Sequence, residues 1–347
     1  MKKIDYLIVG QGIAGSVLAL KMMAAGKSIM VIDNGSKQTS TEKAAGLYNP
    51  ITGRKMVKTW MADELFEGLE EYYASLERLL NSQFLYPLTI YRPFYSNEEA
   101  NDWQAKLSDD QYSPFIKEVN TKSLSLSGVN DEFGGIHLKK CGYIDLPEFR
   151  EAARKYFQSR GVYQQEVFQY QKLVVAEDKV TYDQLVCDSV IFCEGPRSVD
   201  NPFWKDLPFR LVKGEILKIE TDLATDMILN RGVFVVPKKD GFSVGSTYDH
   251  QNLDYEPSEK GIADLRKRLS KLFTLDYSEK GAVAGVRPAT FDRRPFLGTK
   301  CEGKIGIFNG FGTKGVSLVP YFANQFINYL SQKSELIPEV DVNRVIE

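Results

Sequence analysis

The stretch "DYLIVGQGIAGSVLALKMMAAGKSIMVID", residues 5–33, constrains the fold of this chain more than any other. It opens with a β-rich run at 6–9, continues through a glycine-rich turn into apolar residues at helical spacing, and ends in a second β-rich run at 28–32 closed by Asp33. Polar side chains interrupt its apolar part, whereas a secretory signal needs an unbroken apolar stretch. The segment therefore predicts a strand, a tight turn, a helix and a parallel strand.

The turn has the pattern G-x-G-x-x-G, and each glycine has a physical role in binding a dinucleotide. Gly10 permits the turn, Gly12 lets a pyrophosphate approach the backbone, and Gly15 allows close helix packing. Asp33 follows near the spacing of about 20 residues expected for a carboxylate that binds ribose. The predicted contacts are Gly10, Gly12, Ile13, Ala14, Gly15, Asp33 and Asn34. An ordinary βαβ turn or a signal peptide is the alternative interpretation.

Composition excludes several functional classes. The chain has 347 residues and a net charge of −2, so no global field favours nucleic acid or an anionic membrane. No run approaches the roughly 18 apolar residues of a membrane helix. Four cysteines without C-x-x-C spacing and only two histidines argue against a metal site and a disulfide scaffold. We expect a cytoplasmic protein without a bound metal.

The rest of the sequence alternates between an α/β pattern and a β-rich pattern. Helices are predicted at 57–80 and 146–160, two strands within 184–198, and an antiparallel meander at 209–247. The chain closes with a strand, a Gly-rich turn and a helix within 304–330.

Thus the first and last segments of the chain alternate strands and helices, and β-rich segments lie between them. The pattern predicts an α/β fold in which a Rossmann-like dinucleotide-binding domain carries an inserted antiparallel-sheet substrate domain. The first domain is predicted to comprise 1–80, 141–205 and 286–347, and the second 81–140 and 206–285.

Several further motifs support a family resemblance over nearly the whole chain. They are "KAAGLYNP", "CGYIDLPEFREAARKYFQSRG", "VIFCEGPRS", "LVKGEIL", "FVVPKKDGFSVGST", "GVRPATFDRRPFLG" and "NGFGTKGVSLVP". In this order they resemble the FAD-dependent amine oxidase superfamily of D-amino-acid oxidase, glycine oxidase and sarcosine oxidase. "AAGLYNPITG" and "GFGTKG" are most similar to the oxidase half of the bifunctional enzyme that modifies methylaminomethyl-uridine in tRNA.

The resemblance implies FAD as the cofactor. It is expected to be held non-covalently, because the neighbourhood of Pro288 offers no cysteine for attachment. Besides the contacts above, the implied FAD-binding residues are Ala45, Gly46, Leu47, Val167, Cys193, Glu194, Gly195, Arg287, Gly312, Thr313, Lys314, Gly315 and Val316. The N–H groups of the last helix would point at the flavin, where reduction places negative charge.

The resemblance also implies the substrate-binding residues. Arg287 falls where relatives clamp a substrate carboxylate, a role that suits a planar cationic fork. Lys314 would bind the same carboxylate or pair with the reduced flavin, unless it is a solvated lysine. Tyr48 would line the active site, with a structural turn residue as the alternative. Thr313 stands roughly where glycine oxidase has a second carboxylate-binding arginine, and Phe234 where a tyrosine hydroxyl often faces the substrate. Free glycine or sarcosine is therefore a less favoured substrate.

The predicted activity is oxidation of the C–N bond of an amine or amino acid, by hydride transfer to flavin N5 and hydrolysis of the imine. Oxygen or another acceptor would reoxidise FAD. Two alternatives remain: an oxidase acting on a tRNA wobble-uridine side chain, which the near-neutral charge disfavours, and a flavin-binding protein without amine oxidase turnover.

Overall fold

The computed structural model describes residues 1–53 and 55–345 of the chain; residues 54, 346 and 347 of the predicted FAD-binding segments lie outside this part. Within it, one eight-stranded sheet runs in the order β11-β2-β1-β14-β13-β12, with β21 pairing both β14 and β20. Its strands are β1 (Lys2–Val9), β2 (Ile29–Asp33), β11 (Tyr163–Gln165), β12 (Leu173–Val175), β13 (Val180–Tyr182), β14 (Leu185–Phe192), β20 (Phe296–Lys300) and β21 (Ile305–Asn309).

The centre of this sheet is parallel and is buried on both faces. Strand β1 pairs in parallel with β2 and β14, and β14 in parallel with β21. Ile8 packs into one hydrophobic cluster, whereas Leu7 and Val9 pack into another, because successive side chains of a strand point to opposite faces. This is why the predicted strands are continuously apolar instead of alternating.

A second eight-stranded sheet in the described residues has the order β19-β15-β18-β17-β16-β7-β9-β8. Its strands are β7 (Ile90–Pro93), β8 (Ile116–Asn120), β9 (Gly135–Leu138), β15 (Val212–Glu220), β16 (Ile228–Arg231), β17 (Val233–Lys238), β18 (Gly241–Gly245) and β19 (Ser278–Arg287). Helix α7 (Glu259–Leu269) covers one face of it, where Ile262, Leu265 and Leu269 pack against Leu217 and Val244.

Short elements connect these sheets. Strands β3 (Leu47–Tyr48), β10 (Gly142–Ile144) and β6 (Leu85–Pro87) form one small sheet, and β4 (Ile51–Thr52) and β5 (Val57–Lys58) another. The other helices are α1 (Ile13–Ala24), α2 (Ser40–Lys43), α3 (Ala62–Phe66), α4 (Leu69–Leu80), α5 (Asn97–Ala105), α6 (Leu146–Ser159) and α8 (Gly315–Leu330). Single 3-10 turns occupy Lys106–Ser108, Ser113–Phe115, Tyr170–Lys172, Gly195–Asp200 and Val342–Val345.

Two predicted elements are wrong. The single helix predicted at 57–80 is a strand, β5, followed by the two helices α3 and α4, because Met61 and Gly68 adopt positive φ angles of 54° and 64°. The segment 184–198 contains one strand, β14, followed by a 3-10 turn. Helix α6, the antiparallel meander and the closing β21–α8 unit are confirmed.

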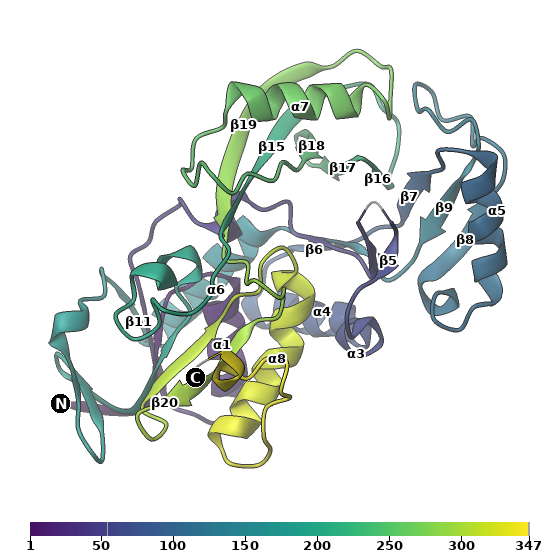
Figure 1. Cartoon of the computed structure of the whole chain (residues 1–347). Helices are drawn as coiled ribbons and strands as arrows, with labels where there is room; N and C mark the ends of the chain where they lie inside the picture. The colour runs from purple at the N-terminus through teal and green to yellow at the C-terminus, as the bar shows by residue number, and fades with distance from the viewer. Residues whose placement is uncertain (54, 346–347) are drawn as a thin grey trace.

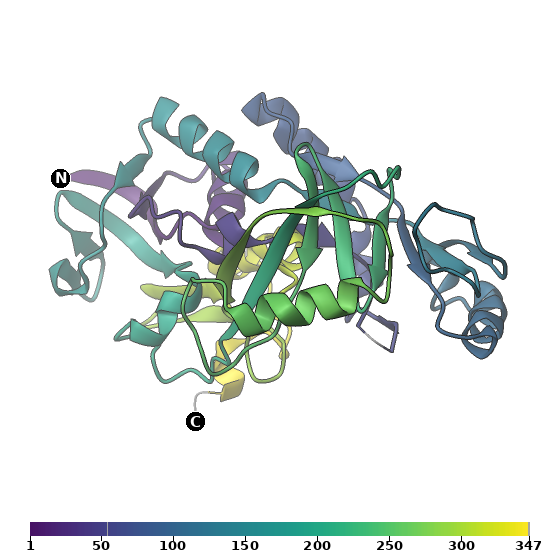
Figure 2. The same ribbon diagram turned by 90° about the horizontal axis from the view of Figure 1, so that it is seen from above.

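The two large sheets form two layers of the molecule. In Figure 1, β15, β19 and α7 lie above, and β20, α1 and α8 lie below. Figure 2 shows α7 lying across the upper sheet, with the segment around 97–138 at the end far from the N-terminus. The upper sheet takes its strands from 90–138 and 212–287, and the lower one from 2–33, 163–192 and 296–309. The division of the chain into two domains at the stated boundaries stays a prediction.

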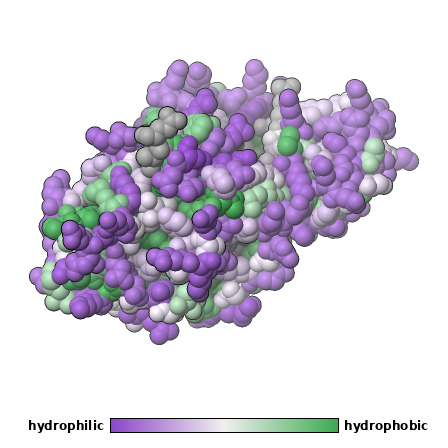
Figure 3. Space-filling model, turned by 60° about the horizontal axis from the view of Figure 1, so that its bottom comes forward, coloured by the Kyte–Doolittle hydropathy of each residue, from purple (hydrophilic) through white to green (hydrophobic). Residues whose placement is uncertain are grey.

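The visible surface carries no large apolar area. The face in Figure 3 is mostly polar, with small and separate apolar patches. Strongly exposed apolar side chains come from distant places in the chain, including Val57, Val167, Tyr248 and Phe291. Single residues of this kind are normal on a protein surface. Among the described residues, no helix is both long and apolar enough to cross a membrane.

Candidate active site

The first glycine-rich turn has no room for a side chain at Gly10 or at Gly15. Gly10 has a φ of 100°, and a Cβ on it would lie 2.6 Å from the carbonyl oxygen of Cys193. A Cβ on Gly15 would lie 1.9 Å from the carbonyl oxygen of Gly10. Gly12 is the N-cap of α1 and has no side chain to bond the first N–H groups of the helix. The turn thus brings β1, β14 and the start of α1 into direct contact and leaves the helix N-terminus available to an anion.

Helices α1 and α8 begin next to each other. A Cβ on Gly315 would lie 3.3 Å from Cγ2 of Ile13, whose N–H donates to Oγ1 of Thr41 at 3.0 Å. Gly312 has a φ of 55°, and its N–H donates to the carbonyl oxygen of Pro288. Two positive helix ends therefore converge, so the place suits a ligand with several negative charges. This arrangement gathers the predicted contacts Ile13, Ala14, Gly312, Thr313, Gly315 and Val316.

The end of β14 forms another side of the same region. Cys193 and Glu194 follow this strand, and Gly195 has a φ of 58° where the 3-10 turn begins. Glu194 accepts hydrogen bonds from Tyr170 Oη at 2.6 Å and from Asn201 Nδ2 at 2.7 Å, and burial raises the pKa of its carboxyl. The side chain of Glu194 is thus engaged inside the fold, and its predicted cofactor contact would involve the backbone.

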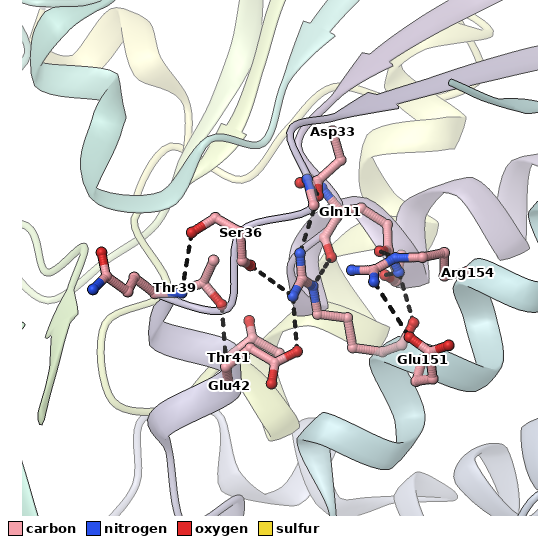
Figure 4. A network of polar contacts seen from close by, with 12 residues as sticks. Gln11, Asp33, Ser36, Thr39, Thr41, Glu42, Glu151 and Arg154 are labelled. Carbon is pink, nitrogen blue, oxygen red and sulfur yellow. Dashed lines mark hydrogen bonds and ion pairs between the residues drawn. The ribbon is translucent and has the colours of Figure 1, made fainter. Parts of the chain in front are cut away.

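Asp33 ends β2 beside the glycine turn (Figure 4). Its Oδ2 accepts from the N–H of Gln11 at 2.8 Å, and its Oδ1 accepts from the N–H of Gly35 at 2.8 Å and from Arg150 Nη2 at 3.0 Å. A carboxylate offers about four acceptor positions, so one remains for a ribose hydroxyl. The ribose contact stays a prediction, and the carboxylate is oriented before any ligand arrives.

Arg150 organises this network, and sequence reasoning missed it. Its guanidinium donates to the carbonyl oxygens of Gln11 and Ser36, each at 2.9 Å, and forms ion pairs with Asp33 and with Glu42 at 2.7 Å. The residue is only 1% exposed. It stands on the apolar face of α6 with Leu146, Phe149, Ala153 and Phe157, and a charge at such a position is the signal that could have revealed it.

The predicted adenosine contacts lie close to Asp33 along the chain or across the sheet. Asn34 follows Asp33, and its Oδ1 accepts from the N–H of Ser36. Val167 is 57% exposed and comes just after Glu166, whose N–H donates to the carbonyl oxygen of Asp33 at 3.0 Å. Their contact with adenine stays a prediction.

The segment of Ala45 and Gly46 is held by the upper sheet. Gly46 has a φ of 75°, and a Cβ on it would lie 1.8 Å from the carbonyl oxygen of Ile144. Lys238, at the end of β17, donates through Nζ to the carbonyl oxygen of Ala45 at 3.1 Å and lies 3.3 Å from the ring centroid of Tyr143. Burial lowers the pKa of Lys238 to about 7. The sequence "PKKDG" has no feature that separates Lys238 from the next lysine, because strand register alone decides it.

Arg287 ends β19 with its guanidinium over Gly214, where a Cβ would lie 1.8 Å from Nη2. It donates to Ser246 Oγ at 2.8 Å and to the carbonyl oxygen of Thr247 at 3.3 Å, and lies 5.0 Å from the ring centroid of Tyr248. In the described part of the chain, no carboxylate lies within ion-pair distance of it. Burial lowers the pKa of Arg287, and the group stays charged because an arginine titrates far above neutrality.

The face of the sheet that carries Arg287 is the one turned toward α2. Gly285 lies two residues before Arg287 on the same strand and therefore faces the same way. A Cβ on Gly285 would lie 2.9 Å from Cβ of Lys43, and the hydroxyl of Ser40 donates to the carbonyl oxygen of Val286. Arg287 thus lies on the inner face of the upper sheet, opposite the face covered by α7.

Lys314 is the N-cap residue of α8. Its Nζ donates to Oγ1 of Thr59 at 3.1 Å, a neutral partner. Burial, together with the charges of Arg293 and Arg294, lowers the pKa of Lys314 to about 8. The group therefore shares its surroundings with other cations, which favours binding of an anion there.

The side chain of Tyr48, which was predicted to line the active site, is buried inside the fold. Along β3, Leu47 is half-buried and Tyr48 is only 2% exposed. Its hydroxyl donates to Oε1 of Glu70 on α4 at 3.0 Å, and burial raises its pKa. The side chain is packed against α4, so a direct role in substrate binding stays a prediction that this geometry does not favour.

The residues fit FAD on structural grounds. A turn built on Gly10, Gly12 and Gly15, two converging helix N-termini and an oriented carboxylate match the pyrophosphate and ribose of a dinucleotide. Pyrophosphate would lie at Gly12 and the first turn of α1, ribose at Asp33, and the flavin near Gly315 and the Ala45 segment.

The chain belongs to the family described as DAO, FAD dependent oxidoreductase, whose profile matches residues 5–327. It is therefore an FAD-dependent oxidoreductase of this family, and the expected fold class and cofactor are confirmed. Non-covalent attachment of FAD stays a prediction.

Two curated relatives match most of this chain at low sequence identity. The chain is 23% identical over 333 residues to the tRNA 5-methylaminomethyl-2-thiouridine biosynthesis bifunctional protein MnmC of Caulobacter sp. (strain K31), covering 91% of this chain and 52% of that protein. It is 21% identical over 370 residues to the bifunctional protein ThiO/ThiG of Trichormus variabilis, covering 95% and 53%. The chain thus spans about half the length of the curated relatives it matches.

Solved structures share the fold over almost the whole chain. Glycine oxidase from Geobacillus kaustophilus superposes with a TM-score of 0.78 at 16% identity, covering 97% of both chains. Iminodiacetate oxidase from Chelativorans sp. BNC1 gives a TM-score of 0.75 at 17% identity, covering 98% of both. At such identities the likeness concerns the fold, and the residues of this chain must decide the substrate.

Proposed function

We propose that this chain oxidises the C–N bond of a small amine that carries a carboxylate, such as an amino acid or an N-substituted amino acid. The observation that carries the proposal is Arg287. It is a charged guanidinium on the inner face of the upper sheet, and its hydrogen-bond partners, Ser246 and Thr247, are neutral. A fork of this kind is suited to a bidentate carboxylate. Glycine oxidase and iminodiacetate oxidase, which share this fold, are named for substrates of this class.

Bound FAD would supply a two-electron acceptor for the reaction. The protein residues would position the substrate: Arg287 binds its carboxylate and thereby fixes the orientation of the neighbouring C–N bond. Lys314 would either bind a second anionic group or balance the negative charge that reduction brings to the end of α8. With positioning and charge supplied in this way, the reaction needs no histidine as acid or base.

The test is an anaerobic screen of the purified yellow protein for loss of flavin absorbance. Amino acids and N-methyl amino acids are each paired with the amine that lacks the carboxylate, for example alanine with ethylamine. We expect reduction by members of the carboxylate series and at least tenfold weaker apparent affinity for their decarboxylated partners. Equal apparent affinities in the two series would contradict the proposed carboxylate site. A protein that no amine reduces would be a flavin-binding protein without this activity.

A tRNA-borne amine is the competing substrate class, favoured by the sequence match to MnmC. That match covers about half of MnmC, and the net charge of this chain is −2. Binding to phosphate groups depends steeply on salt. A filter-binding titration with bulk tRNA at two salt concentrations separates the classes: salt-sensitive binding together with tRNA-dependent flavin reduction would favour this second function.

A further inference from the structure

We infer that Glu215 and Thr247 are positioning residues for the substrate carboxylate, because they hold Arg287 in place from the opposite side of the sheet. The inference rests on the proposed role of Arg287. The three residues form a continuous path: the Glu215 carboxylate binds the Thr247 hydroxyl, and the Thr247 carbonyl binds the Arg287 guanidinium.

Strand β15 separates the two ends of this path. Gly214 faces Arg287, so its neighbours Lys213 and Glu215 point to the other face of the strand, toward α7. The position of Glu215 confirms this, since its Oε1 accepts from the N–H of Ser258, the N-cap residue of α7, at 2.6 Å. Glu215 therefore cannot touch a substrate bound at Arg287 and must act through an intermediate residue.

Thr247 is that intermediate. It follows β18, and its hydroxyl donates to Glu215 Oε2 at 2.9 Å while accepting from the N–H of Glu215 at 2.9 Å. Its carbonyl oxygen points the other way and accepts from Arg287 Nη1 at 3.3 Å. The next residues continue the ladder, since Asp249 and Lys213 exchange backbone hydrogen bonds at 2.8 and 3.0 Å. The side chain of Thr247 thus fixes the backbone group that orients Arg287.

The charges show why this arrangement leaves Arg287 free for a ligand. Lys213 and Glu215 are each 2% exposed, and Lys213 Nζ lies 3.8 Å from Glu215 Oε1 and 2.6 Å from Asp254 Oδ1. Glu215 is therefore balanced by Lys213 and by the N-terminus of α7. Because Thr247 stands between them, Glu215 orients Arg287 without neutralising it.

Gly261 shows how closely this carboxylate is fitted. It lies in the first turn of α7, and a Cβ on it would lie 1.5 Å from Oε2 of Glu215. Alanine is a better helix former than glycine, so Gly261→Ala by itself favours the helix. The same substitution must displace the Glu215 carboxylate, so it separates the local helix preference from the positioning role.

The experiment uses the FAD-loaded protein and acetate as the probe, with acetamide as the neutral match, followed by the flavin spectrum. We expect Thr247→Val, Glu215→Gln and Gly261→Ala each to weaken acetate binding about tenfold, the equivalent of one buried hydrogen bond. Thr247→Ser keeps the hydroxyl and should restore binding to within about twofold of the wild type. Thr299→Val is the matched control, because it removes the hydroxyl pair between Thr299 in β20 of the lower sheet and Tyr329 in α8, and it should leave acetate binding unchanged.

Coupling to Arg287 decides between positioning and general damage. In an Arg287→Met background, Thr247→Val should cause no further loss of acetate binding, since the two changes act on one interaction. Wild-type acetate affinity in Thr247→Val, or an additive loss in the double variant, would overturn the inference while the carboxylate role of Arg287 stands. If Arg287→Met itself binds acetate as well as the wild type does, the proposed function fails and the inference fails with it.

Discussion

Two arginines of this chain differ in what surrounds their charge. Arg150 in α6 is 1% exposed and contacts two carboxylates, those of Asp33 and Glu42. Arg287 in β19 is half-buried, yet its hydrogen-bond partners are a hydroxyl and a carbonyl. Arg150 is electrically satisfied by its own fold, whereas Arg287 retains a charge that an added carboxylate can neutralise.

The difference separates an arginine that stabilises the fold around Asp33 from an arginine that is proposed to bind the substrate. A buried charge pair costs most when one partner is removed, because the other is left without compensation. A buried cation with neutral partners has the opposite property, since removing it leaves no orphaned charge but removes the attraction for an anion. Replacing Arg150 should therefore lower mainly stability, whereas replacing Arg287 should lower mainly the binding of a carboxylate.

The largest effect is expected for Arg150→Met. It leaves Asp33 and Glu42 without their cation, and loss of one partner from a buried ion pair typically costs about 3–5 kcal/mol. We expect the free energy of unfolding in urea to fall by this order and FAD to be released during purification. Full FAD content with wild-type stability would show that Asp33 and the glycine turn need no support from α6.

Arg287→Met should reverse the pattern. The charge-assisted bonds to a carboxylate are worth roughly 1.5–3 kcal/mol, so the apparent affinity for a carboxylate-bearing amine should fall roughly 10- to 100-fold. Stability and FAD content should stay near the wild-type values, because no carboxylate loses its partner. Kinetics of anaerobic flavin reduction and urea unfolding measure the two quantities on the same preparation.

Lys238 offers a pH-dependent comparison. Burial lowers its pKa from an ordinary value of 10.5 to about 7, so between these values the unfolded chain binds more protons than the folded one. Stability then rises with pH over this window, and the cost of the buried charge is fully present below pH 7. Relative to Lys238→Met, the wild-type free energy of unfolding should increase from pH 6 to pH 10. A pH-independent difference would show that Lys238 is solvated in solution.

The smallest effect is expected for Lys155→Ala, on the same helix as Arg150. Lys155 Nζ lies 4.0 Å from Glu151 Oε1, and their side chains are 73% and 47% exposed. Exposed pairs at this spacing are worth about 0.3–0.5 kcal/mol, so urea unfolding should change by no more than this. A larger loss would mean that charge on α6 matters in general, and it would weaken the contrast drawn from Arg150.

Individual residues show which features could be predicted from the sequence and which could not. The glycine turn, Asp33 and Arg287 were predicted, because turn chemistry and motif context mark them locally. The helix predicted at 57–80 failed at Met61 and Gly68, whose positive φ angles interrupt an otherwise regular apolar spacing. Arg150, Lys238 and Glu215 were missed, since each acquires its role from a partner more than 30 residues away.

The glycine-rich turn and the class of fold could be predicted from the sequence, because glycine conformations and strand and helix periodicity are local properties, and the family resemblance pointed to Arg287. Which charges are neutralised depends on the tertiary structure. Asp33 meets Arg150, and Arg287 meets neutral groups, through strand register and helix packing that join distant segments. Electrostatic function depends on those distances, which no short stretch of sequence contains.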